Sequence, residues 1–356
     1  MSIYTNWDPL EEVIVGNCVT ESNKHWNLDK AAKPLFDRIL RETKEDLDHL
    51  ADYLTKLNVK VLRPNPSSFP EQIDFSDFTI TTPTQPIVPR DQYFVYDKTI
   101  YQTYTSMPDR YVDAYSYYDI FSDLFSQGYN WLSQPPPMIK NFPPDSKWYT
   151  AGQEIYGKEL ADKMLWHTAT MYKCGDTLIT NTQGPGTQLG LEWMRRNINA
   201  EIISNNSPYT NNFGHIDHGF YMIDDETVIC LEENWLPEAL KNKKIINLQG
   251  LYYPFDYGKF TSWTNTGQSK LDPEWLDKWL TQWKGYAQKV AFEANVLVVD
   301  STNIIFSTRQ PKVFDLLSKH GINCHVVEMR HGMFWEAGIH CLTLDVKRQG
   351  LKRKIV

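Results

Sequence analysis

One segment near the C-terminus says most about the fold and chemistry of this 356-residue chain: Gly338-Ile339-His340-Cys341-Leu342-Thr343-Leu344-Asp345-Val346-Lys347-Arg348. Its cysteine stands at the start of an apolar strand pattern, directly after a loop that contains glycine. A nucleophile in that place can be reachable while its backbone stays rigid. The other interpretation of Cys341 is a buried structural cysteine, which residue type alone favours. We expect His340 to add little, because neighbours along a strand point to opposite faces.

Short β-branched runs recur along the whole chain, and amphipathic helices separate them. The predicted strands cover residues 12–16, 59–62, 93–96, 177–180, 201–203, 227–230, 295–299 and 341–346, and the predicted helices cover residues 34–57, 189–197, 273–283 and 311–320. No glycine-rich phosphate-binding motif follows these strands, so the usual signature of a dinucleotide-binding fold is missing. The alternation indicates an α/β fold of repeated modules, and the lack of a flexible linker favours one domain over residues 1–356.

The composition argues against several classes of protein. The chain has 36 basic and 44 acidic residues, a net charge of −8, and its basic residues cluster only at the C-terminus, which argues against a nucleic-acid partner. The N-terminus has no targeting pattern and no long apolar window exists, so we expect a soluble, cytoplasmic protein without a membrane partner. Five cysteines without C-x-x-C pairing predict neither a disulfide framework nor a zinc site.

A second group of reactive side chains lies in residues 214–220, in the pattern His215-Ile216-Asp217-His218. If this segment is a strand, alternation puts His215 and Asp217 on one face. A histidine beside a carboxylate, far from Cys341 in sequence, fits a Cys/His catalytic pair that meets only in the fold. The pattern also allows a metal interpretation, but no third ligand cluster at suitable spacing supports it. We therefore predict no metal and no cofactor.

Five motifs follow one another along the chain: NWDPLEEVIVG (6–16), Pro89-Arg90-Asp91, LEWMRR (191–196), His215-Ile216-Asp217 and GIHCLTLDVKR (338–348). Taken alone, a carboxylate such as Asp91 just before a predicted strand is most often a turn residue. In this order, the motifs resemble those of the amidinotransferases, a family that includes the glycine and inosamine-phosphate enzymes. The resemblance spans residues 6 to 348, almost the whole chain.

The resemblance implies a fold and a set of roles. The fold is the guanidino-group-modifying or pentein fold, a five-bladed α/β propeller of ββαβ modules around a central channel. Cys341 would be the nucleophile and His215 the general acid and base, while Asp91 and Asp217 would hold a guanidinium. A guanidinium is a poor electrophile, so attack on it needs carboxylates that fix the cation and a thiolate already formed.

The implied reaction moves the amidino group of L-arginine, or of another guanidine, to a primary amine by a ping-pong route through a covalent amidino-cysteine. The substrates are small molecules, and family members are commonly homodimers. Two alternatives stay open: a guanidine hydrolase of the same superfamily, in which water resolves the intermediate, and a catalytically impaired guanidine-binding homologue.

The chain departs from the family pattern in two places. The family's third catalytic member, an aspartate, falls on His167, and the arginine with which the glycine enzyme binds a substrate carboxylate falls on or near Asn234. Before His215 stand Asn212 and Gly214, and the glycine falls where the family usually has a side chain that narrows the acceptor pocket. We therefore expect an acceptor amine larger than glycine. This altered pocket resembles the members that cyanobacteria use in pathways to saxitoxin-like and cylindrospermopsin-like guanidines, which implies a role in secondary-metabolite biosynthesis.

Overall fold

In the part of the chain that the structure describes, five three-stranded sheets build the fold, and all five have the same internal order of strands. In each sheet the first two strands pair antiparallel and the third pairs parallel to the second, as in β5–β6–β7. The computed structural model describes residues 2–22, 28–68, 73–74, 79–80, 85–105, 110–137, 163–182, 186–205, 215–251, 273–287 and 294–356. Within these residues the repeated unit is strand, strand, helical segment, strand, which is the ββαβ module that the family resemblance predicts.

The modules follow one another along the chain. The first comprises β17 (Thr343–Arg348), β1 (Leu10–Val15), α1 (Ala32–Lys56) and β2 (Lys60–Leu62), and the second comprises β5 (Tyr93–Tyr96), β6 (Thr99–Gln102), α2 (Ala114–Ser126) and β7 (Asn130–Ser133). The third comprises β8 (Met171–Cys174), β9 (Thr177–Thr180), α4 (Gln188–Asn197) and β10 (Glu201–Ser204). The fourth comprises β11 (Phe220–Met222), β12 (Thr227–Cys230), the 3₁₀ turns η7 (Glu233–Trp235) and η8 (Glu238–Leu240), and β13 (Lys244–Asn247). The fifth comprises β14 (Leu297–Asp300), β15 (Asn303–Phe306), α7 (Pro311–Lys319) and β16 (Asn323–Val326).

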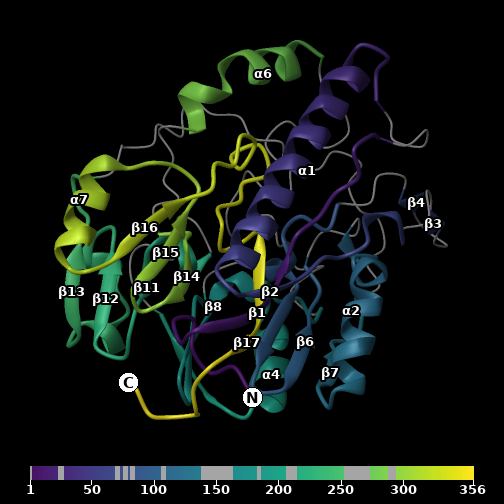
Figure 1. Ribbon diagram of the computed structural model, residues 1–356. Helices are drawn as coiled ribbons and strands as arrows, with labels where there is room; N and C mark the ends of the chain where they lie inside the picture. Colours follow the sequence, from purple (N-terminus) through teal and green to yellow (C-terminus); the bar gives the residue numbers. More distant parts are fainter. Residues whose placement is uncertain are drawn as a thin grey trace.

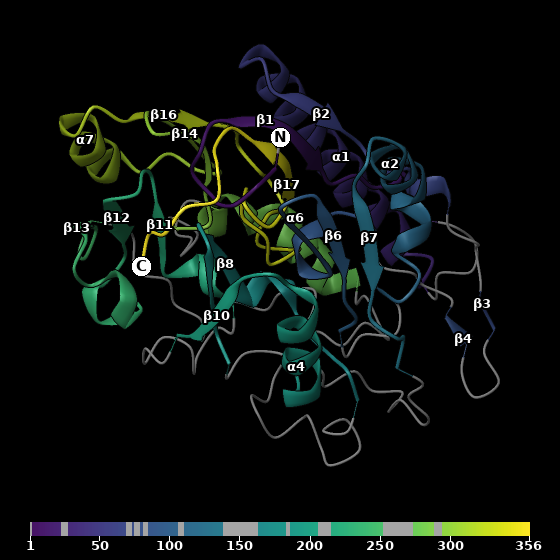
Figure 2. The same ribbon diagram turned by 90° about the horizontal axis from the view of Figure 1, so that it is seen from below.

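Both ends of the chain contribute to the first module, and this closes the ring. Strand β17, the last of the chain, pairs antiparallel with β1, so that Leu344 lies opposite Ile14. Seen from below, the sheets follow one another around the centre of the molecule, and α2, α4 and α7 lie on the outside (Figure 2). The segment that carries Cys341 is therefore fixed by a strand from the other end of the chain.

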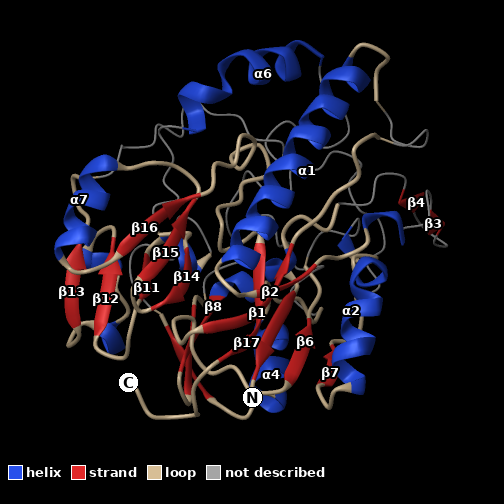
Figure 3. Ribbon diagram, in the orientation of Figure 1, coloured by secondary structure: helices blue, strands red, loops and turns tan. Residues whose placement is uncertain are grey.

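The long helix α1 covers the first module because its apolar residues fall on one stripe. Leu47, Leu50 and Leu54 are buried in one cluster with Val13 of β1 and with Cys341. Each buried leucine contributes about 1.5–3 kcal/mol relative to an exposed one, so this stripe anchors the segment before β17. Outside the modules, α6 (Pro273–Ala287) packs against α1 (Figures 1 and 3), and β3 (Ile73–Asp74) pairs with β4 (Thr79–Ile80).

Several predicted elements are confirmed, with small shifts at their ends. The strands at 93–96, 177–180 and 227–230 have the predicted bounds, and the four predicted helices correspond to α1, α4, α6 and α7. The strand expected at 341–346 begins only at Thr343, and Cys341 lies in the turn before it. No helix in the described part of the chain has the length and apolarity that a membrane span requires.

Candidate active site

Each of the five modules contributes the segment that leads into its first strand. These segments are Ile339 to Leu342 before β17, η2 (Pro89–Asp91) before β5, His167 with η5 (Thr168–Thr170) before β8, His215 with η6 (Ile216–His218) before β11, and Asn295 before β14. Contacts join η2 to η5, η5 to η6 and η2 to β17. The segments therefore meet at one end of the ring, and residues far apart in sequence form one buried cluster.

Cys341 lies at the centre of this cluster and is buried. Its Sγ is 3.5 Å from Asp217 Oδ2, to which the thiol can donate, and it accepts a hydrogen bond from Asn295 Nδ2 at 3.0 Å. Burial raises the pKa of the Cys341 thiol well above its usual value, and the charges of Asp217 and Asp91 raise it further, although Asn295 and Arg90 oppose them. In the free protein Cys341 is therefore a thiol.

The expectation for His340 is wrong, because its segment is a turn and not a strand. The amide of Thr343 donates to the carbonyl of His340 at 3.2 Å, so His340 and Cys341 are not forced to opposite faces. His340 Nδ1 lies 2.6 Å from Asp217 Oδ2, the same oxygen that faces Cys341. Asn6 lies on the other side of the ring, with its Nδ2 3.1 Å from His340 Nε2.

The protonation of His340 follows from these neighbours. The backbone N–H of Lys173 donates to Asn6 Oδ1, so the Asn6 amide presents its Nδ2 donor to His340 Nε2. The ring proton then belongs on Nδ1, where it is donated to Asp217. Burial, together with the charge of Arg90, lowers the pKa of His340 to about 4, so the imidazole is neutral near pH 7. The sequence contained this residue inside the C-terminal motif, but the wrong local structure hid its role.

The segment around Asp217 also differs from the predicted strand. Ile216–His218 forms a 3₁₀ turn, in which residues three apart share a face, and the rings of His215 and His218 lie 5.6 Å apart. Burial acts to raise the pKa of Asp217, but the hydrogen bond from His340 and the nearby imidazoles outweigh it and lower the pKa overall. Asp217 is therefore ionised beside the thiol.

Asp91 and His167 form the opposite wall of the cluster. Asp91 Oδ2 accepts a hydrogen bond from Arg110, whose Nη2 also donates to Asp113 Oδ2 at 3.1 Å. Asp91 Oδ1 is 3.9 Å from Nδ1 of His167, and the His167 ring lies 4.8 Å from the ring of His215. Burial acts to raise the pKa of Asp91, but His167 and Arg110 outweigh burial, so the pKa of Asp91 is lowered overall. No motif in the sequence pointed to Arg110, whose contact with Asp91 of η2 appears only in the fold.

His167 is neutral in these surroundings. Burial lowers its pKa to about 3, against the attraction of Asp91 and with the help of His215. The structure thus places an uncharged imidazole where the family resemblance implies a carboxylate.

Of the other predicted residues, Asn234 is exposed and lies in η7, beyond the end of β12. The last residue of β12, Cys230, pairs with the first residue of β11, so Asn234 lies at the same end of its module as His215 but outside the buried cluster. Asn212 and Gly214 lie outside the described residues.

Two overlapping groups contain atom types that can bind a metal. One is His215, Asp217, His218 and Cys341, and the other is Asp91, His167 and His215; within each group the candidate atoms lie within 4.8 Å of one another. The fold thus supplies Cys341 as the third ligand type that the sequence did not show. However, Asp217 Oδ2 is already engaged by His340, and Cys341 is engaged by Asn295. We therefore assign no metal to the site.

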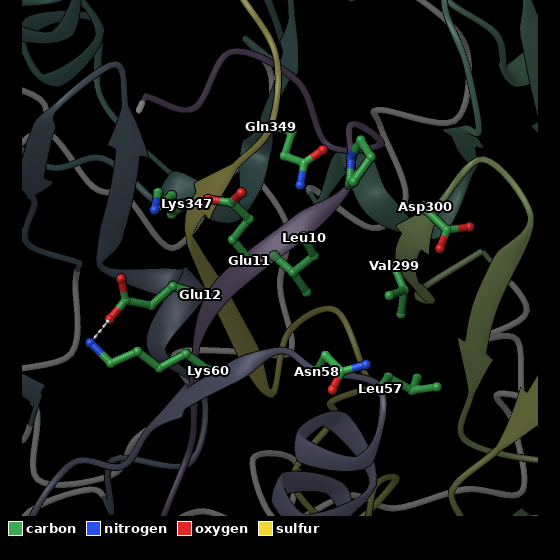
Figure 4. Close-up of a pocket in the computed structure, with 11 residues that line it drawn as sticks. Leu10, Glu11, Glu12, Leu57, Asn58, Lys60, Val299, Asp300, Lys347 and Gln349 are labelled. Atoms are coloured by element: carbon green, nitrogen blue, oxygen red, sulfur yellow. Dashed lines mark ion pairs between the residues drawn. The ribbon is translucent and has the colours of Figure 1, made fainter.

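A concavity of about 510 Å³ lies away from this cluster (Figure 4). It is lined by Leu10, Asp300 and Lys347, among others, and at its edge Lys60 forms an ion pair with Glu12 at 2.6 Å. Lys347 belongs to the end of β17 that is remote from Cys341. The concavity is therefore on the opposite side of the first module and is not part of the candidate active site.

Known proteins are similar to this chain both in sequence and in architecture. Inosamine-phosphate amidinotransferase 1 of Streptomyces griseus is 28% identical over 366 residues, which cover 98% of this chain and 97% of that protein. The solved structure of inosamine-phosphate amidinotransferase StrB1 from Streptomyces griseus has a TM-score of 0.74 at 24% identity and covers 99% of this chain and 98% of its own. SxtG, an amidinotransferase from Microseira wollei in the saxitoxin biosynthetic pathway, has a TM-score of 0.73 at 20% identity. The match covers 100% of this chain and 99% of SxtG. No family model matches the chain.

These similarities confirm two predictions from the sequence. The fold is the five-bladed α/β propeller of the guanidino-group-modifying enzymes, built from ββαβ modules. The resemblance to the amidinotransferases is confirmed as well, because a curated amidinotransferase matches 98% of this chain at 28% identity, and this similarity supports a transferase enzyme.

Proposed function

We propose that this protein moves the amidino group of L-arginine, or of a closely related guanidine, to a primary amine, with Cys341 as the nucleophile. One observation carries the proposal: a buried thiol lies 3.5 Å from an ionised carboxylate and within 4.8 Å of the nitrogen of His215. The cluster contains a nucleophile, a base and an anion for a cationic substrate, which are the parts that this reaction needs.

Asp217 and Asp91 are not equivalent as partners for a guanidinium. Asp91 shares its charge with Arg110, a permanent cation. The close partners of Asp217 are the imidazoles of His340 and His218 and the thiol of Cys341, all neutral in the free protein. Asp217 therefore supplies most of the attraction for a donor cation, and Asp91 helps to orient it. When the cation binds, its charge lowers the pKa of the thiol.

The first half-reaction makes the covalent intermediate. Cys341 gives its proton to His215, and Sγ attacks the central carbon of the guanidinium. The bond from that carbon to the donor's amine nitrogen breaks, and His215 returns the proton to the leaving amine. A positively charged amidino group remains on Cys341.

The second half-reaction regenerates the enzyme. His215 takes a proton from the acceptor amine, whose nitrogen attacks the amidino carbon and expels the thiolate of Cys341. The proton on His215 then returns to the sulfur. His340 stays neutral throughout and holds Asp217 in place through its Nδ1 proton.

The acceptor side follows from the departures in sequence. With Asn234 exposed and uncharged, no arginine at this position binds an acceptor carboxylate. We therefore infer an amine larger than glycine, without a carboxylate at that position. The similarity to SxtG, named as a saxitoxin-pathway enzyme, supports a role in secondary-metabolite biosynthesis. A cytoplasmic location and a homodimeric state remain predictions from the sequence.

Mass spectrometry of protein incubated with arginine alone tests the nucleophile. We expect an added amidino group on the peptide that contains Cys341 and none on the peptide of Cys324, a half-buried free cysteine that serves as an internal control. An unmodified Cys341 in folded protein would refute the proposal. Primary amines added afterwards should remove the group and yield a new guanidine. Release of urea or citrulline without an amine would show that the enzyme is a hydrolase instead.

A further inference from the structure

We propose that Asn295 is a positioning residue that fixes the sulfur of Cys341 and stabilises its thiolate form. The side chain is fully buried and meets Cys341 twice: Nδ2 lies 3.0 Å from Sγ, and Oδ1 accepts the backbone N–H of Cys341 at 3.1 Å. The inference rests on the proposed role of Cys341 as the nucleophile.

The chemistry of the two contacts determines how the Asn295 amide is turned. A backbone N–H is always a donor, so its partner must be the oxygen Oδ1. Nδ2 is then the atom that faces the sulfur, and it can only donate. A hydrogen bond to an ionised acceptor is about twice as strong as one to a neutral acceptor, so this contact favours the thiolate over the thiol.

The close approach of Asn295 depends on Gly338. A Cβ atom added to Gly338 would lie 2.5 Å from Asn295 Oδ1 and 2.8 Å from its Cβ. Gly338 is not among the glycines with a positive φ, so a side chain at this position would act through this contact and not through backbone strain. The glycine of the C-terminal motif thus makes room for the amide that holds the cysteine.

The other charged and titratable groups near the sulfur come from three segments: η6 with the residue before it, η2, and the turn that carries Cys341. These groups are Asp217, His215 and His218 from η6 and the residue before it, Asp91 and Arg90 from η2, and His340 from the turn itself. The two carboxylates disfavour the thiolate, and the imidazole of His340 is neutral. Asn295, which belongs to the fifth module, favours the thiolate through its direct contact with the sulfur, and so it acts against the two carboxylates before any substrate is bound.

The test measures alkylation of Cys341 by iodoacetamide in the free protein over a range of pH, quantified on its peptide by mass spectrometry. Loss of a hydrogen bond to a charged group corresponds to a pKa shift of about one to two units, so Asn295→Ala should raise the pH midpoint by that amount. At one pH below the midpoint, alkylation should slow about 3- to 10-fold, because a more basic thiolate is also intrinsically more reactive. Asn295→Asp keeps the oxygen for the backbone N–H but adds a negative charge, and it should raise the midpoint further.

Two further variants separate positioning from general stability. Asn303→Ala removes a side chain that donates to Asp300 at 2.9 Å in the same module, without contact to the site, and should leave the midpoint unchanged. Gly338→Ala should shift the midpoint in the same direction as Asn295→Ala. If both Asn295 variants keep the wild-type midpoint, or if Asn303→Ala shifts it equally, the inference is wrong. The readout needs no turnover, so its failure is distinct from a failure to form the amidino-cysteine.

Discussion

Replacing His167 with aspartate tests how this site holds a cation without the family's third carboxylate. Nδ1 of histidine and the oxygens of aspartate are the same number of bonds from the backbone. In His167→Asp, a carboxylate oxygen would therefore stand about where Nδ1 now lies, 3.9 Å from Asp91 Oδ1. The variant exchanges a neutral imidazole for a second negative charge at that distance.

The magnitude follows from that distance. Two unit charges about 4 Å apart interact by about 4 kcal/mol at an effective dielectric constant of about 20. Without substrate this is repulsion, which raises the pKa of the carboxylate pair by about three units and lowers the stability of the free protein. When a guanidinium is bound between the carboxylates, its attraction to both of them replaces their repulsion. The cost of desolvating the new charge reduces the gain in binding free energy. We expect arginine to bind about 10- to 100-fold more tightly in the variant at pH values where both carboxylates are ionised.

Calorimetric titration with arginine measures this effect, in a Cys341→Ala background that prevents the covalent step. His167→Asn is the matched control, because it removes the imidazole without adding charge, and its affinity should stay within a few-fold of the parent. The gain in His167→Asp should shrink as the pH falls toward about 5, because a proton then occupies the carboxylate pair. If the aspartate and asparagine variants bind arginine equally well at high pH, His167 does not face the donor cation and the charge argument fails.

Three other predictions concern stability and the support of the cluster. Burial lowers the pKa of His167 to about 3, so between about pH 6.5 and pH 3 the unfolded chain takes up a proton that the folded chain does not. The free energy of unfolding should therefore decrease as the pH is lowered through this range. In urea titrations, His167→Asn should reduce the dependence of this free energy on pH by up to about 1.4 kcal/mol per pH unit. Burial lowers the pKa of Lys173 to about 7, and its Nζ lies 4.0 Å from Asp345 Oδ2 without a hydrogen-bond partner among the described residues, so Lys173→Met should leave the free energy of unfolding unchanged or raise it. Arg348→Met removes a hydrogen bond of 2.9 Å to Asp345 and should cost about 3–5 kcal/mol. Arg90 Nε donates to the carbonyl of His340 in the turn before β17, at 2.8 Å, and to that of Thr343, the first residue of β17, at 3.1 Å. Arg90→Lys should therefore lower the turnover rate, while arginine binding measured by calorimetry changes little.

The sequence predicts the strands best where they are runs of β-branched residues. Thr177–Thr180 and Thr227–Cys230 are such runs and are confirmed. Their partners were missed: β11 has only three residues, and β8 carries Lys173, a charged residue that is buried because it lies beside Asp345 in the interior. Without these short first strands the sequence shows alternation but not the number of modules. The propeller could be predicted only through the family resemblance.

The candidate site was predicted where its residues lie inside motifs and missed where they do not. Cys341, His215 and Asp91 each stand in a short conspicuous pattern. Arg110 does not, and its contact with Asp91, 19 residues away in sequence, is not encoded by local propensity. His340 was set aside because a strand was assumed where a turn occurs. One residue of error in where a strand begins is enough to reverse the predicted orientation of a side chain.

The architecture itself supplies the signal that the sequence interpretation lacked. In a ring of equivalent modules, every residue just before a first strand occupies an equivalent place near the central channel, whatever its type. Four residues of the cluster occur at this position, two to four residues before the first strand of their module: Cys341 before β17, Asp91 before β5, His167 before β8 and Asp217 before β11. Applied to the fifth module, the same rule selects the residues before β14, and Asn295 is the polar one whose side chain reaches the sulfur. The sequence predicts a strand over residues 295–299, and in a ring of equivalent modules the topology alone would select its first residue as a site residue. The candidate site is thus distributed over all five modules, and a module without a conspicuous motif still contributes a contact to Cys341.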